Sequence, residues 1–171
     1  KSAGENNQGL FAVALGRNAG QTSQGNNGIA IGNYAGNDRQ SSGIAIGASA
    51  GQTLQGGSTI AIGSSAGQTS QGLRAIAIGL NAGNSGQNSE AISIGREAGQ
   101  TDQNSNAIAI GYIAGNDNQG ALAIAIGQGA GEVDQGINAI AIGEKAGYQS
   151  QAARSIIINA TGVDQTNSNA D

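Results

Sequence analysis

Aliphatic side chains recur along this chain at a fixed interval. The tetrapeptide Ile-Ala-Ile-Gly, or a close variant, ends at a glycine that returns every 16 residues and once after 15. We call these residues the strand glycines; they are Gly16, Gly32, Gly47, Gly63, Gly79, Gly95, Gly111, Gly127 and Gly143, with Asn159 in the tenth place. Self-similarity at one period over a whole chain predicts a solenoid or an array.

Each repeat carries one predicted β-strand. Large aliphatics lie three and one residues before each strand glycine, and a small residue, usually alanine, lies between them. This alternation has period two, so the two aliphatics share one face of a short strand. No stretch shows helical spacing, and glycine is too frequent for helices. The sequence therefore predicts an all-β, parallel β-solenoid (β-roll) of about ten 16-residue coils.

A coil of 16 residues encloses a narrow core, and the isoleucine pairs are predicted to fill it. The predicted core ladder comprises Ile29, Ile31, Ile44, Ile46, Ile60, Ile62, Ile76, Ile78, Ile92, Ile94, Ile108, Ile110, Ile124, Ile126, Ile140 and Ile142.

The opposite face of the same strands is then a stripe of small residues, which favours close approach of another chain. As the subunit interface we predict Ala14, Ala30, Ala45, Ala61, Ala77, Ala109, Ala125 and Ala141. An exposed alanine stripe with no partner is the alternative.

A glutamine follows every strand glycine by eight residues. These residues are Gln24, Gln40, Gln55, Gln71, Gln87, Gln103, Gln119, Gln135 and Gln151. Stacked coils bring equivalent side chains to about 4.8 Å, so the column is predicted to be an amide hydrogen-bond ladder. The alternative is that glutamine is only a tolerated turn residue. The single 15-residue step lies between Gln40 and Gly43 and leaves strand and glutamine in place.

The two ends depart from the repeat. Residues 1–8 are predicted to be a partial preceding coil because Gln8 is in register with the glutamines, which suggests a longer array. Residues 9–159 form the predicted β-roll repeat domain, and residues 160–171 the C-terminal cap and tail. Ile157 and Asn159 replace the usual small residue and glycine, as is common in capping repeats.

Composition excludes most other classes of function. The 171 residues include 31 glycines but no cysteine or histidine, so thiol and imidazole chemistry are absent. Carboxylates such as Glu132 and Asp134 are scattered among repeat positions, and we expect neither an enzyme nor a cofactor or metal site. The net charge of −4 and the dispersed basic residues argue against nucleic-acid binding, and the lack of a long apolar run argues against direct membrane contact.

The recurrent Ala-Ile-Ala-Ile-Gly followed by x-x-Ala-Gly resembles the YadA-like head repeats of trimeric autotransporter adhesins over residues 9–159. It is also similar to repeats of some phage and viral tail-fibre proteins. The resemblance implies a left-handed parallel β-roll, a homotrimer about one axis, and an extracellular location on a bacterial cell or virion surface. This chain departs from those heads in its longer period and its unbroken glutamine column.

We therefore predict a non-enzymatic trimeric surface fibre segment, which acts as a rigid spacer and as an adhesion or host-attachment module. Its partners would be itself and an unknown surface receptor or matrix component. Tyr34, Arg96 and Tyr112 at variable corners are candidate receptor contacts, although drift at unconstrained positions explains them equally well. The alternative function is an ice-binding β-solenoid, which would use a column of threonines six residues after the strand glycines. That column is interrupted, for example by Asp38 and Asp117.

Overall fold

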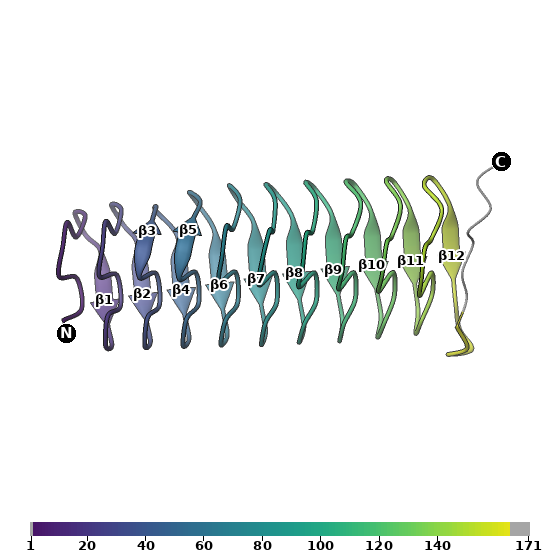
Figure 1. Cartoon of the computed structure of the whole chain (residues 1–171), viewed down its shortest axis with the longest axis horizontal. Helices are drawn as coiled ribbons and strands as arrows, with labels where there is room; N and C mark the ends of the chain where they lie inside the picture. The colour runs from purple at the N-terminus through teal and green to yellow at the C-terminus, as the bar shows by residue number, and fades with distance from the viewer. Residues whose placement is uncertain (1, 165–171) are drawn as a thin grey trace.

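The computed structural model describes residues 2–164, which form a parallel β-solenoid of about nine turns. Each turn advances by 16 residues, except for one turn of 15. The coils stack into a straight, narrow rod, with β1 near one tip and β12 near the other (Figure 1). The described residues contain strands and turns but no helix.

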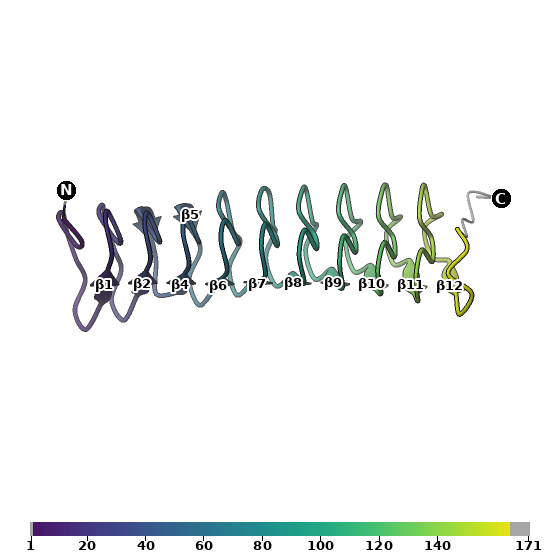
Figure 2. The same cartoon turned by 90° about the horizontal axis from the view of Figure 1, so that it is seen from below.

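One sheet of ten parallel strands runs along the whole rod. Its strands are β1 (Val13–Leu15), β2 (Ile29–Ile31), β4 (Ile44–Ile46), β6 (Ile60–Ile62), β7 (Ile76–Ile78), β8 (Ile92–Ile94), β9 (Ile108–Ile110), β10 (Ile124–Ile126), β11 (Ile140–Ile142) and β12 (Ile156–Ile158). Equivalent residues pair from coil to coil, so isoleucine lies beside isoleucine and alanine beside alanine. Figure 2 shows these strands in a row along one side of the rod.

The second side of the coil has little regular strand. Only β3 (Asp38–Gln40) and β5 (Thr53–Gln55) pair as strands there among the described residues. Elsewhere single parallel bridges join the same repeat position, as between Thr69 and Ser85. The second side is therefore joined from coil to coil mainly by isolated bridges.

Glycine is required where the main strand ends, because neighbouring coils approach closely there. Gly79 has a φ of 133°, and a Cβ built on it would lie 2.5 Å from the carbonyl oxygen of Gly95 in the next coil. Any side chain would force the coils apart. The other corners accept left-handed residues of many types, including Ser70, Arg74 and Asn81.

The core of the coil is built from alanine, which is the reverse of the prediction. The middle alanine of the main strands, outside the first coil, and the alanine three residues after each strand glycine are completely buried, as Ala77 and Ala82 illustrate. Ser93 and Ile157 take the middle position in β8 and β12. The isoleucines on either side of that middle alanine point outward and are half-buried or exposed. The sixteen isoleucines predicted to form the core ladder, from Ile29 to Ile142, therefore lie on the outer surface of the sheet.

The alanines predicted to form the subunit interface face inward instead. Ala30, Ala45, Ala61, Ala77, Ala109, Ala125 and Ala141 are 0% exposed, and Ala14 in the first coil is partly buried. They contact the opposite wall of their own coil, so another chain cannot reach them.

The glutamines explain why alanine occupies the interior. All nine, from Gln24 to Gln151, are buried, and they are the largest fully buried side chains among the described residues. Each extends from the second side to the main strand; Gln103 Nε2, for example, donates to the Ile92 carbonyl at 2.9 Å. Because this amide crosses the whole coil, the space beside it accommodates a methyl group but not an isoleucine.

The glutamines also form a ladder along the rod. Each Nε2 donates to Oε1 of the glutamine in the next coil at 3.0–3.3 Å, from Gln24 to Gln40 and from Gln55 through to Gln151. From Gln24 onward the single break lies between Gln40 and Gln55, at the 15-residue step. Gln55 Oε1 is consequently buried without a partner.

The ends continue the stack as far as they are described. The amide of Gly4 donates to Ala19, and Asn6 bridges to Thr22, so this segment covers the first full coil. Of the predicted C-terminal cap and tail, residues 160–164 follow β12, and residues 165–171 lie outside the described residues.

Candidate functional site

The most extensive candidate surface is the outer face of the main sheet. We define the isoleucine face as the side chains three and one residues before each strand-glycine position in the ten main strands. The second isoleucine of β6 and of β8 to β11 is 36–38% exposed, as for Ile94 and Ile126, whereas Ile78 in β7 is partly buried, and the first isoleucine of each of these strands is partly buried. The pairing of equivalent residues makes this face two continuous columns of aliphatic side chains.

A second column of polar side chains, which sequence reasoning missed, runs along the other side of the coil. The residue five after the strand glycine is Gln or Asn in seven of nine coils. Its amide donates to the equivalent oxygen of the preceding coil, as from Asn37 to Gln21 and from Gln68 to Gln52. These amides therefore donate toward the N-terminal end of the rod, whereas those of the main glutamine ladder donate toward the C-terminal end. The recurrence of amide residues at this position was the available signal.

The three candidate receptor residues do not form one site. Arg96 lies over the ring of Tyr112 in the adjacent coil, 4.1 Å from its centroid, and both are exposed. Tyr34 lies four coils away and contacts Arg17, whose guanidinium carbon is 5.4 Å from the ring centroid. These contacts are cation–π pairs between neighbouring coils.

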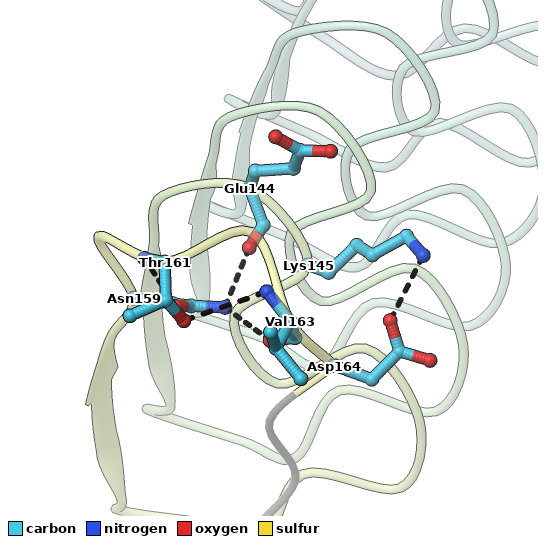
Figure 3. A network of polar contacts seen from close by, with 6 residues as sticks. All are labelled: Glu144, Lys145, Asn159, Thr161, Val163 and Asp164. Atoms are coloured by element: carbon cyan, nitrogen blue, oxygen red, sulfur yellow. Dashed lines mark hydrogen bonds and ion pairs between the residues drawn. The ribbon is translucent and has the colours of Figure 1, made fainter.

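The last coil is closed by a polar network that Asn159 organises (Figure 3). Its Nδ2 donates to the carbonyls of Glu144 and Val163, and its Oδ1 accepts from the backbone and hydroxyl of Thr161. Lys145 pairs with Asp164 at 2.9 Å beside this network. Among the described residues no further coil follows, so the position that requires glycine elsewhere can carry a side chain here.

Two ionisable groups near this end have shifted pKa values. Burial raises the pKa of Glu132, Lys145 partly opposes that effect, and Asp164 adds to it. Glu132 Oε2 is buried without a hydrogen-bond partner. The hydrogen bond and charge of Asp164 raise the pKa of Lys145.

The described residues contain no pocket and no group of three or more acidic, histidine or cysteine side chains placed to hold a metal ion. Within residues 2–164 no helix has the length and apolar character needed to cross a bilayer.

Fold and surface together define the class of this protein as a parallel β-solenoid repeat protein with an exposed aliphatic face. Comparisons of the chain with protein-family models, with curated proteins and with solved structures find no match.

Proposed function

We propose that this chain is a rigid, non-enzymatic segment of a homotrimeric surface fibre, in which the isoleucine faces of three copies pack together. The observation that carries the proposal is the pair of unbroken aliphatic columns on the outside of the coil. Extended apolar surfaces of this kind on folded proteins usually mark contacts with other proteins.

The dimensions of the face suit a stable interface. Ten strands about 4.8 Å apart give a length of about 45 Å, and the seven residues from five before to one after the strand-glycine position, which include the residues bordering the face, span about 20 Å. The resulting area of about 900 Å² is comparable with the ~800 Å² that each partner buries in a typical specific interface. Each isoleucine removed from water contributes on the order of 1 kcal/mol, since only part of its surface is exposed in the single chain.

The number three, the left-handed sense and the surface location rest on the resemblance of the repeat to adhesin heads and tail fibres. In this proposal the coils act as a stiff spacer on a bacterial cell or virion, and variable corners such as Tyr34 and Tyr112 contact a receptor or matrix component. Continuous pairing of ten strands and the buried amide ladder support the stiffness.

Sedimentation equilibrium tests the assembly directly. We expect a particle of three times the 16.6 kDa chain mass at low micromolar concentration. Ile110→Asp places a charge in the centre of the face and should give a folded monomer by circular dichroism. Thr69→Asp, on the second side of the coil, is the matched control and should remain trimeric. A parent chain that is folded and monomeric would contradict the proposal.

Ice binding remains the second candidate because four hydroxyl residues, Thr53, Thr69, Ser85 and Thr101, are consecutive in one bridged column. These four residues form a single short row, which ends at Asp38 on one side and at Asp117 on the other. Thermal hysteresis by the purified chain would favour this function, and its absence would remove it.

A further inference from the structure

Two columns of exposed side chains border the isoleucine face. One, the leading rim, is the residue five before each strand-glycine position, and the other, the trailing rim, is the residue directly after that position. Both are exposed in all ten coils. Protein interfaces have this anatomy, with an apolar centre and a polar edge.

In three of the ten coils the two rims carry residues of matching or opposite charge character. Asn27 shares its coil with Asn33, Ser58 with Ser64, and Glu90 with Arg96. Phe11 and Arg17, an aromatic and a guanidinium, share the first coil. Glu90 and Arg96 are the one pair of charged residues on the two rims of the same coil, and their charges are opposite.

Contacts within one chain do not account for this matching. The two rim residues of a coil are six positions apart, on either side of the three-residue strand, at a separation of up to about 20 Å. Within a chain each rim residue meets instead the equivalent residue of the next coil, as in the ion pair between Arg74 and Glu90.

We infer that the leading rim of one copy contacts the trailing rim of the next copy in the same coil, with Glu90 paired to Arg96. The inference rests on the proposed assembly of copies through the isoleucine face. In a closed ring every copy lies at the same height along the axis, so coils of equal number meet.

The alternative registers are less favourable. Sliding one copy by one coil in one direction brings Arg74 against Arg96, which repel each other. Sliding it in the other direction places the Glu90 carboxylate against Leu80. Rim charges therefore select the register, and the isoleucine columns, which are nearly identical from coil to coil, cannot do so.

Both charged residues are available for such a pair. Arg74 binds only Oε1 of Glu90, so Oε2 has no hydrogen-bond partner among the described residues, and the side chain is exposed. Arg96 is exposed and stacks on Tyr112 with one face of its guanidinium, which leaves its N–H edge free. In this arrangement Arg96 and Tyr112, which both lie on the trailing rim, are interface residues rather than receptor contacts.

The chain has no cysteine, which permits a direct cross-linking test. The variant Glu90→Cys with Arg96→Cys, treated with a short bis-maleimide, should run as a covalent trimer on a denaturing gel. Either single variant should stay monomeric, since identical rims do not meet in a ring. Arg96→Cys with Asp102→Cys, which lies on the second side of the coil, is the matched control and should form no covalent oligomer.

The outcomes separate this inference from the proposed function. A trimer by sedimentation without cross-links in the double variant, or cross-links in a single variant, would overturn the rim pairing alone. Cross-linking that stops at a dimer would overturn the three-copy ring. A monomer by sedimentation would remove the proposed function itself.

Charge reversal gives an independent measurement. Glu90→Arg and Arg96→Glu should each raise the dissociation constant of the assembly at least tenfold at low salt, and the two together should restore it to within about threefold of the parent. The repulsion between position 90 and Arg74 is present in the double variant as well, so recovery reports on position 96 of the next copy. Failure of the double variant to recover would count against the pair.

Discussion

The glutamine ladder differs between the short step, from Gln40 to Gln55, and the regular steps that follow. In every regular step the side-chain nitrogen donates to the next glutamine. At the short step Gln40 Nε2 donates only to the carbonyls of Ile29 and Gly43. The main strands nevertheless keep their register, with Ile29 still paired to Ile44.

The difference shows that backbone pairing sets the register and that the amide ladder follows it. The deleted residue lies in an exposed corner, where a shorter loop is readily accommodated. The short step is also where β3 and β5 pair on the second side of the coil. A longer backbone ladder therefore accompanies the loss of one side-chain hydrogen bond.

The largest loss of stability should come from overfilling the alanine core. This core is present both at the short step and in the regular coils. Ala45→Leu at the short step and Ala109→Leu in a regular coil should each cost about 3 kcal/mol or more, because both alanines are fully buried. Chemical denaturation measures the loss, with exposed Ala48→Leu as the control. A much smaller loss for Ala45→Leu would mean that the short step is loosely packed.

Removing a glutamine should distinguish the two regions. Gln103→Leu abolishes donation to Ile92, Ala107 and Gln119 and should cost about 2 to 3 kcal/mol. Gln40→Leu abolishes fewer bonds and should cost about 1 to 2 kcal/mol. Thermal melts compare the two, and Asn88→Ala in an exposed corner should change little. Equal losses would show that the break in the ladder has no energetic consequence.

Restoring the missing residue should repair the ladder. One glycine inserted after Ser42 gives this step the regular length and should let Gln40 reach Gln55 Oε1, with a gain of about 1 kcal/mol. Denaturant midpoints measure the change. Deleting Ser89 in a regular coil is the converse experiment and should produce a loss of similar size; a gain on deletion would contradict the interpretation.

The smallest change in stability should come from Glu132. This residue lies in the second column of polar side chains, five residues after a strand glycine. Its carboxylate has no hydrogen to donate to Asn116, and burial raises its pKa. The folded state therefore retains the proton to higher pH than the unfolded state, and stability falls as pH rises from the ordinary carboxyl value through the raised pKa. Glu132→Gln should raise the melting temperature slightly at neutral pH and flatten that dependence. A melting temperature that depends more steeply on pH in the variant than in the parent would contradict a raised pKa of Glu132.

The sequence predicts the period, the strand positions and the in-register stack because these depend only on the spacing of residue types. It does not determine which strand face is inside, since the alternation of Ile78 with Ala77 defines two faces without orienting them. The volume of Gln87 decides the orientation, and this becomes evident only when the amide is seen to cross the coil. The pairing of Arg96 with Tyr112 likewise depends on rotamers that spacing does not specify.

The hydrogen bonds of this solenoid run along the rod, and its strands lie across it. Tension applied between the two tips would break the hydrogen bonds that join an end coil to its neighbour, and the coils would then detach one after another. Each released coil would give up about 5 Å of rod and provide about 50 Å of extended chain. A single chain pulled from its ends would therefore lengthen in steps of nearly constant size, and the alanine core would be lost one layer at a time.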